Sequence, residues 1–305
     1  MKKQFSLTII AAIFTAGFSN LTNAGVSYSN YLDSGSGNAC NSTSSFNRSL
    51  NVVGLTSDQR LVCFNENSPS QVTNIGTITG LTGGDSTLVG IDYRVQNRRL
   101  YGVGNAGGIY LLDVSNATAT PVNRLSVALS GASFGVDFNP SADRLRIVSD
   151  NGQNLRHNVN AGGVTLTDDP LDYAPGAPLN SVGPTALGVV GSAYTNNDLD
   201  ATTNTTLYAL DSSLDQISVQ SPPNNGSLVA TGKLTVDATA VAGFDTYSTI
   251  RNGVTVNVQS LASIKTADGA TKLYSINVPT GKASSRGSFS SENQIIDIAI
   301  PLNQL

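Results

Sequence analysis

Short stretches of alternating hydrophobic and polar residues run along most of this chain, and a recurring tripeptide marks where groups of them begin. The tripeptide combines a small or apolar residue, a hydrophobic residue and, in most copies, an aspartate. Its copies are Gly90-Ile91-Asp92, Gly135-Val136-Asp137, Gly188-Val189-Val190, Gly243-Phe244-Asp245 and Ile295-Ile296-Asp297. They recur about every 45–55 residues, a spacing typical of β-propeller blades. The pattern therefore predicts a repeating β architecture in which Val190 replaces the aspartate of one unit.

Within each unit, alternating segments separated by turn residues predict four strands. The second unit gives strands at 87–94, 99–103, 109–114 and 122–129, and the third at 134–138, 144–148, 155–159 and 164–167. The first unit has three, at 51–55, 60–64 and 73–78, and the C-terminal segment 294–302 has the pattern of the missing one. We therefore expect an all-β fold, a single β-propeller closed by pairing of the C-terminal strand in the first blade. Five blades fit this count, and six is the alternative if the fourth or fifth unit contains a further sheet.

The N-terminus has the pattern of a secretory signal peptide. Lys2 and Lys3 precede the apolar run 7–18, and Ala24 is the small residue that a signal peptidase accepts. The run is too short for a spanning helix, and an uncleaved anchor is the alternative. We expect a signal at 1–24, an irregular extension at 25–48 and the propeller domain at 49–305. The mature protein is then secreted or periplasmic, with no membrane span.

The low content of charged residues and the net negative charge limit the kinds of molecule that this protein can bind. Charged residues make up 12% of the chain, about half the usual share, and the formal net charge is −4. Without a basic patch to neutralise phosphates, nucleic acid is excluded as a partner. The two cysteines, Cys40 and Cys63, form an even count after an export signal, which predicts one disulfide between the extension and the first blade.

Several motifs in one order resemble the DUF4394 family. They include Asp137-Phe138-Asn139-Pro140, Asp143-Arg144-Leu145-Arg146, Gln153-Asn154-Leu155-Arg156, Ala193-Tyr194-Thr195-Asn196-Asn197 and Gln220-Ser221-Pro222-Pro223-Asn224-Asn225-Gly226. The resemblance covers roughly residues 50–302. It implies a β-propeller-like domain of unknown function that is common in exported bacterial proteins. It supplies no reaction and no catalytic residues.

The repeated aspartates are the first candidate site. Because the first strand of each propeller blade lines the central channel, Asp92, Asp137, Asp245 and Asp297 are expected at similar heights around it. Converging carboxylates need a cation or raised pKa values to coexist, and Ca²⁺ is the candidate metal. The alternative is that each aspartate accepts turn N–H groups within its own blade.

The second candidate site is arginine-rich. Arg144, Arg146 and Arg156 lie in one unit and suit an anionic ligand, with the alternative that they pair with nearby aspartates and fasten blades together. Tyr194 is a ligand-binding candidate because the chain has no Trp to stack against sugars. His157, the single histidine, falls at a sheet-packing position, which argues against a catalytic triad.

These features favour a non-catalytic binding module of the bacterial envelope or extracellular space, with a glycan, peptide or protein as ligand. The alternative is a hydrolase of a glycoside or lactone that uses the channel aspartates, with or without Ca²⁺. A third reading is a purely structural envelope protein. The catalytic residues of a hydrolase are not identified by any motif in the sequence.

Overall fold

The computed structural model describes residues 40, 49–174 and 183–304 of this chain. The chain divides into two units, 1–36 and 37–305, and every described residue belongs to the second unit. The predicted signal peptide lies outside the described residues, as does the predicted extension apart from Cys40. In the part that is described, no helix has the length and apolar character needed to cross a membrane.

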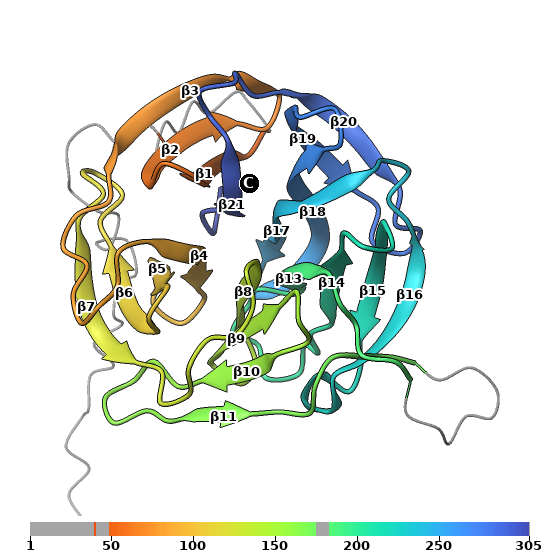
Figure 1. Ribbon diagram of the computed structural model, residues 1–305, viewed down its shortest axis with the longest axis horizontal. Coiled ribbons are helices and arrows are strands. Elements are labelled where there is room, and N and C mark those ends of the chain that lie inside the picture. Colours follow the sequence, from red (N-terminus) through yellow and green to blue (C-terminus); the bar gives the residue numbers. More distant parts are fainter. Residues whose placement is uncertain (1–39, 41–48, 175–182, 305) are drawn as a thin grey trace, which may run out of the picture. The chain divides into compact units, whose positions relative to one another are not determined.

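The described strands form five sheets that surround a common axis, and all of their pairings are antiparallel except that of the short strand β12 (Figure 1). We number them as blades 1–5 in chain order. Blade 1 contains β21 (Ile295–Ala299), β1 (Asn51–Thr56), β2 (Arg60–Asn65) and β3 (Ser68–Thr77), and blade 2 contains β4 (Leu88–Arg94), β5 (Arg99–Gly104), β6 (Gly108–Leu112) and β7 (Ala119–Arg124). Blade 3 contains β8 (Phe134–Asn139), β9 (Arg144–Ser149), β10 (Asn154–His157) and β11 (Thr165–Thr167).

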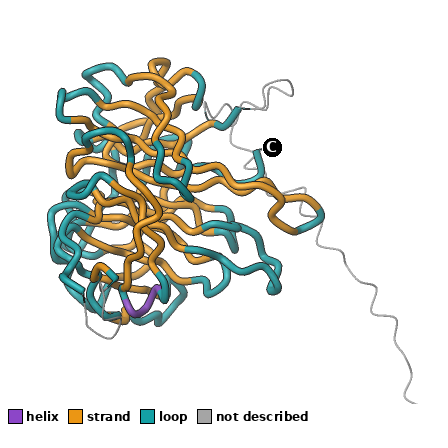
Figure 2. Tube along the Cα trace, turned by 90° about the vertical axis from the view of Figure 1, so that its right-hand side faces the viewer, coloured by secondary structure: helices purple, strands orange, loops and turns teal. Residues whose placement is uncertain are grey.

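Blade 4 contains β13 (Val189–Tyr194), β14 (Leu207–Asp211), β15 (Gln216–Gln220), β16 (Ser227–Lys233) and the additional short strand β12 (Asp172–Tyr173). Blade 5 contains β17 (Ala238–Arg251), β18 (Val254–Thr266), β19 (Thr271–Ile276) and β20 (Ala283–Ser288). A short 3-10 helix, η2 (Pro223–Asn225), connects β15 to β16, and a side view shows strands and loops nearly everywhere else (Figure 2). The fold is therefore a five-bladed β-propeller, as predicted.

The C-terminal strand closes the ring. β21 pairs antiparallel with β1, with Leu55 opposite Asp297 and Val53 opposite Ala299, so that both ends of the propeller meet in blade 1. The innermost strands of the blades are β21, β4, β8, β13 and β17. This closure confirms the predicted role of the C-terminal segment and pairs β1 on both sides, with β21 and with β2.

The hydrophobic core is divided among the interfaces between neighbouring blades. One buried cluster joins blade 1 residues such as Leu55 and Leu61 to Ile91 and Leu100 of blade 2, and another joins Tyr101 of blade 2 to blade 3 residues. Three further clusters connect blade 3 to 4, blade 4 to 5 and blade 5 to 1. Each blade is thus held by apolar contacts on both of its faces.

The outermost strands differ most from the sequence prediction. The predicted strand 122–129 is β7 at Ala119–Arg124, and the predicted strand 73–78 starts earlier, at Ser68. Most residues of β7 are exposed, so the strand carries little hydrophobic alternation to define its ends. The parallel strand β12 was not predicted because its two residues are too few to show a pattern.

The repeat register in blade 4 also differs from the prediction. Asp92 pairs with Tyr101 and Asp137 with Arg146, whereas the equivalent partner in blade 4, Tyr208, pairs with Ala193. The prediction that Val190 replaces the aspartate in blade 4 is therefore wrong, because Ala193 occupies that position. Val190 lies where the register shifts between Val189 and Gly191, an irregularity that an unbroken tripeptide match does not detect.

Candidate functional site

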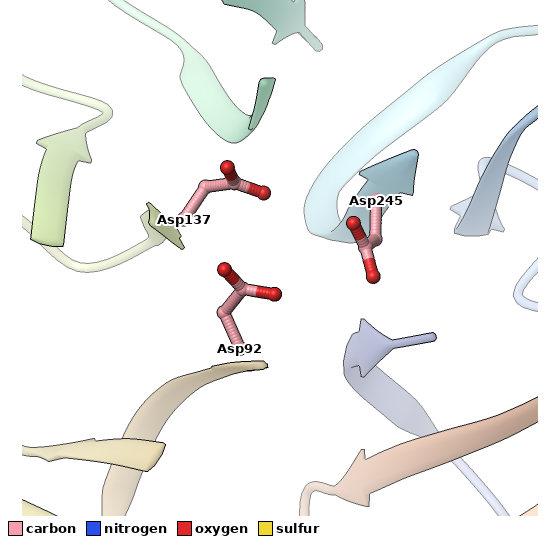
Figure 3. A group of neighbouring side chains, drawn as sticks. All are labelled: Asp92, Asp137 and Asp245. Carbon is pink, nitrogen blue, oxygen red and sulfur yellow. The ribbon is translucent and has the colours of Figure 1, made fainter. Parts of the chain in front are cut away.

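Three of the predicted aspartates converge at the axis of the ring. Asp92, Asp137 and Asp245 are buried and each offers a carboxylate oxygen, with these oxygens all within 4.8 Å of one another. They extend from the inner strands β4, β8 and β17, and Figure 3 shows their carboxyl groups facing a common centre. Asp297 is also buried, but it does not belong to this group of mutually close oxygens. We call these three residues the axial cluster.

Backbone amides hold the aspartates in place, and most of the bonds run between blades. Asp92 Oδ2 accepts from Phe138 N at 2.7 Å, Asp137 Oδ1 from Tyr194 N at 3.0 Å, Asp245 Oδ2 from Ile300 N at 2.6 Å, and Asp297 Oδ2 from Ile91 N at 2.8 Å. Asp92, Asp245 and Asp297 also accept the N–H of the next residue in their own strand. The expectation of bonds confined to each blade is therefore only partly met, because the repeated aspartate also links each of these blades to its neighbour.

Burial makes the charged form of these carboxyls costly. It raises the pKa of Asp92, Asp137 and Asp297 well above the ordinary value, and it raises that of Asp245 to about 6. The neighbouring charge of Asp245 adds to the effect on Asp92, and that of Asp92 adds to the effect on Asp137. A hydrolase that used these groups would need an open pocket at the axis, whereas the side chains are at most 6% exposed.

All four predicted binding residues of the second candidate site line one cavity. A cavity of about 220 Å³ is bordered by Arg144, Arg146, Arg156 and Tyr194, together with Asn139, Ala142, Pro223 and Asn224. The arginines come from β9 and β10 of blade 3, Tyr194 from the inner strand of blade 4, and Asn224 from η2. We call this cavity, between blades 3 and 4, the arginine pocket.

The charges in the arginine pocket are only partly balanced. Arg146 Nη1 lies 2.6 Å from Asp168 Oδ2, and Arg156 Nε lies 2.9 Å from Asp168 Oδ1. Arg144 makes no ion pair with the described residues, and its Nη1 donates to the backbone carbonyls of Ala142 and Asp143. Three guanidinium groups therefore line the cavity, and one carboxylate, that of Asp168, partly neutralises their charge.

The aspartates that lie nearest to these arginines in the sequence have other partners. Asp143 pairs with Arg94 of blade 2 and so fastens blades 2 and 3, while Asp150 accepts the backbone N–H of Ala132. The carboxylate that serves Arg146 and Arg156 is Asp168, which follows β11. Its role could not be read from spacing, because only the folding of the sheet brings the residue after β11 beside β9 and β10.

The proline-rich loop after β15 also contributes to the pocket. Asn224 Oδ1 accepts a hydrogen bond from Arg146 Nη2 at 2.8 Å, and the Tyr194 hydroxyl accepts one from Arg146 Nε at 3.4 Å. The acceptor atoms of both side chains thus face the buried guanidinium of Arg146. The Asn224 amide N–H and the Tyr194 O–H remain as donors at the cavity.

His157 is a structural residue. It is buried, with Nε2 3.0 Å from Asn123 Oδ1 and Nδ1 3.0 Å from Thr165 Oγ1. The Asn123 amide nitrogen donates to two backbone carbonyls, so its oxygen accepts from Nε2–H. Burial lowers the pKa of His157 to about 4, and the charge of Arg144 adds to this effect. No serine completes a catalytic triad here among the described residues.

The lowered pKa predicts a pH dependence of stability. In the unfolded chain the histidine takes up a proton below about pH 6.5, whereas in the folded protein it stays neutral down to about pH 4. The neutral His157 therefore contributes fully to the stability of the folded protein above pH 6.5, and this contribution is lost as the pH falls toward 4. The Tm of the wild-type protein should fall more steeply over this window than that of His157→Gln, and equal slopes in a thermal-melt series would show that His157 does not titrate this way.

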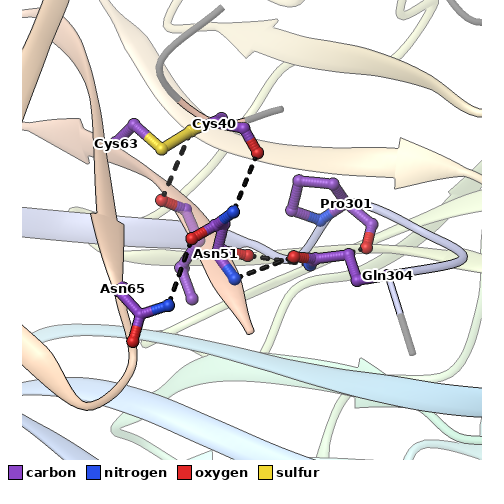
Figure 4. Close-up of a disulfide and its surroundings, with 7 residues drawn as sticks. Cys40, Asn51, Cys63, Asn65, Pro301 and Gln304 are labelled. Atoms are coloured by element: carbon purple, nitrogen blue, oxygen red, sulfur yellow. Dashed lines mark hydrogen bonds between the residues drawn. A yellow bond between two sulfur atoms is a disulfide. The ribbon is translucent and has the colours of Figure 1, made fainter. Parts of the chain in front are cut away.

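Cys40 and Cys63 form the predicted disulfide, with Cα atoms 5.5 Å apart (Figure 4). Asn51 Nδ2 donates to the carbonyl of Cys40 at 3.1 Å. The backbone N–H of Asn51 donates to Gln304 Oε1 at 2.8 Å, and Gln304 Nε2 donates to the backbone carbonyl of Asn51 at 2.8 Å. The disulfide therefore fixes Cys40 next to the point where the two ends of the propeller meet.

Removing the disulfide should destabilise the protein. The bond closes a loop between residues 23 positions apart, which in the chain-entropy picture stabilises the fold by about 3 kcal/mol. The double variant Cys40→Ser/Cys63→Ser should lose about that free energy of unfolding in urea titrations. Reductant should lower the stability of the wild type by a similar amount and leave the variant unchanged.

A family model described as a domain of unknown function, DUF4394, matches residues 60–299. The chain belongs to the DUF4394 family. This match spans the strands from β2 to β21 and confirms the resemblance found in the sequence motifs. No curated protein matches this DUF4394 chain.

Solved structures give only distant likenesses. An auxiliary nutrient binding protein from Bacteroides thetaiotaomicron is 15% identical, with a TM-score of 0.38, and the match covers 77% of this chain and 57% of that one. Glutaminyl cyclase from Myxococcus xanthus is 14% identical, with a TM-score of 0.36 and 72% coverage of each chain. A Bacteroides thetaiotaomicron protein of unknown function is 14% identical, with a TM-score of 0.42, and the match covers 83% of this chain and 66% of that one. These values identify no ligand or activity for this chain.

Proposed function

We propose that this protein is an exported, non-catalytic binding module that captures an anionic group in the arginine pocket. The observation that carries the proposal is the charge of the lining: Arg144, Arg146 and Arg156 line a cavity of about 220 Å³. Arg146 and Arg156 share the carboxylate of Asp168, and Arg144 pairs with no described carboxylate. A guanidinium that faces a cavity without a carboxylate partner is suited to bind a carboxylate, sulfate or phosphate group.

The remaining polar groups support an anion rather than a cation. Tyr194 and Asn224 turn their acceptor oxygens toward Arg146, which leaves hydrogen-bond donors for a ligand. The cavity is smaller than typical drug-sized sites, so it fits one anionic group with few attached atoms. We therefore propose that the ligand is the charged end of a larger molecule, such as an acidic sugar of a glycan or the carboxylate of a peptide.

The lining also supports binding over catalysis. Its described residues include three arginines, a tyrosine and two asparagines, and they offer neither a pair of carboxyl groups nor a serine or cysteine nucleophile. The disulfide supports the export part of the proposal, because such bonds form and persist in oxidising compartments. A rigid propeller whose loops shape one charged cavity is typical of a recognition module.

A thermal-shift screen tests the proposal. Phosphate, sulfate, acetate and glucuronate should raise the Tm of the wild type at constant ionic strength, with chloride as the reference. Arg144→Ala should lose this shift, while Lys282→Ala, which removes the same charge from an exposed position on the β19–β20 turn, should keep it. If no anion in the panel shifts the wild type, or if both variants respond equally, the arginine pocket is not the binding site.

A further inference from the structure

The geometry at the axis points to a second site, separate from the arginine pocket: we infer that Asp92, Asp137 and Asp245 bind one Ca²⁺ ion. Their oxygens lie within 4.8 Å of one another and come from three different blades. The ion would therefore join blades 2, 3 and 5 at the centre of the ring, where Figure 3 shows the three carboxyl groups converging.

The negative charge of the axial cluster has no positive partner in the described part of the chain. None of the described ion pairs involves Asp92, Asp137 or Asp245, although all three are buried. Buried carboxylates this close repel one another unless a cation or a proton neutralises them. A divalent cation removes this repulsion and satisfies several oxygens at once.

Asp137 supplies an independent sign of a missing partner. Its side chain is 2% exposed, and its Oδ1 accepts the amide of Tyr194. In the described residues Oδ2 has no hydrogen-bond partner, whereas both oxygens of Asp92 and of Asp245 accept backbone N–H groups. In blade 4 the equivalent position is Ala193, which supplies neither a charge nor a donor there. The unpartnered oxygen is the natural first ligand of an ion at the axis.

The chemistry of the donors favours Ca²⁺. All of the donors are carboxylate oxygens, which hard cations prefer, and oxygens already bonded to one N–H keep a lone pair for a metal. Two ligand oxygens of one Ca²⁺ are separated by at most about 5 Å, twice a bond of about 2.5 Å, so the observed spacing fits. Mg²⁺ demands shorter bonds and near-ideal octahedral geometry, and it retains several waters, which a buried three-blade site does not favour.

Calorimetric titration of the EDTA-dialysed protein with CaCl₂ tests this inference. The wild type should bind one Ca²⁺ with a Kd of about 10⁻⁴–10⁻³ M, as extracellular calcium modules do, and CaCl₂ should raise its Tm by several degrees. MgCl₂ at the same concentration should have a clearly smaller effect.

The variant Asp137→Asn keeps an acceptor for Tyr194 N and should bind Ca²⁺ at least tenfold more weakly. Asp211→Asn removes a charge from another buried aspartate, in blade 4, and should bind like the wild type. If Asp137→Asn fails to fold by circular dichroism, Asp245→Asn serves in its place. A wild type that releases no heat with CaCl₂ and shows no Tm shift overturns the inference, as does unchanged binding in Asp137→Asn. Anion binding in the arginine pocket should persist in Asp137→Asn, so the two proposals can fail separately.

Discussion

Deletion of residues 295–305 is expected to abolish cooperative folding of the propeller. The deletion removes β21, the inner strand of blade 1, and with it the buried side chains of Ile295, Ile298 and Ile300. It also removes Asp297, which accepts the amide of Ile91 in blade 2, and the amide of Ile300, which is donated to Asp245 in blade 5. The deletion therefore opens both interfaces of blade 1. We expect this to remove most or all of the about 5–15 kcal/mol that typically stabilises a domain.

Circular dichroism and urea unfolding should show no cooperative transition for the truncated protein. A synthetic peptide of residues 294–304, added in excess, should restore part of the transition by supplying β21 in trans, and a scrambled peptide should not. A truncated protein that unfolds cooperatively with near wild-type stability would contradict closure of the ring through β21.

Replacing Gly243 by alanine is expected to cost about 3 kcal/mol or more of unfolding free energy, the upper end of the range for overpacking. A Cβ at Gly243 would lie 2.4 Å from Asp297 Cα and 2.6 Å from Ile298 N, which are backbone atoms of the adjacent inner strand. No side-chain rotation relieves such contacts, so the inner strands of blades 5 and 1 must separate. The hydrogen bond from Ile300 N to Asp245 would be strained by the same movement.

Gly102, in β5, provides the matched control. A Cβ there would lie 3.0 Å from Leu88 Cδ1 and 3.1 Å from Leu112 Cδ1, the mobile ends of two leucine side chains. Gly102→Ala should therefore cost only about 1 kcal/mol in urea titrations. Equal losses for the two variants would show that close approach of the inner strands is not the reason for the repeated glycine.

The same contacts explain why the opening residue of the repeat is small. A Cβ at Gly135 would lie 2.6 Å from Ser192 N, and one at Gly191 would lie 2.8 Å from Phe244 Cβ. Glycine at the start of the repeat thus allows neighbouring inner strands to approach near the axis, and the aspartate two positions later bonds to the neighbouring blade in blades 2, 3 and 5. The sequence pattern that predicted the fold is the pattern required at the centre of the ring.

The inner and middle strands could be predicted because both of their faces are buried between blades, which makes each one a short, largely apolar run bounded by turn residues. The predicted strand 144–148 is β9 at Arg144–Ser149, and 60–64 is β2 at Arg60–Asn65. Exposed outer strands such as β7 are not constrained in this way. Ala193 was missed because the bulge after Val189 breaks the spacing on which the comparison of repeats relied.

The candidate sites could be predicted as residue sets but not as assemblies. Arg144, Arg146 and Arg156 were recognisable as an unusual group of charges, whereas Asp168 and Asn224 join them only through the folded sheet. Asp297 was grouped with the axial aspartates by its place in the tripeptide, but its carboxylate accepts from Ile91 N instead. The position in β21 that corresponds to the aspartate is Ala299, because Asp245 accepts from Ile300 N just as Asp92 accepts from Phe138 N, the residue after Asp137. The tripeptide therefore identified the inner strand of blade 1 but placed its aspartate two residues too early.

The two proposed sites meet at Tyr194. Its backbone N–H holds Asp137 of the axial cluster, and its side chain lines the arginine pocket. Arg144 and Asp137 are therefore the positions at which the two sites can be tested separately. Arg144 lines the arginine pocket and is not part of the axial cluster, whereas Asp137 is part of the axial cluster and does not line the pocket.

Calorimetric titration of the wild type and of Arg144→Ala with glucuronate and with phosphate tests the central claim most directly. A guanidinium–anion hydrogen bond contributes about 1.5–3 kcal/mol, so the substitution should weaken binding of the preferred anion at least tenfold. Binding by the wild type should also weaken as salt increases, because the attraction is electrostatic. A wild type that releases no heat with either anion, or an Arg144→Ala variant with unchanged affinity, would contradict anion capture in the arginine pocket.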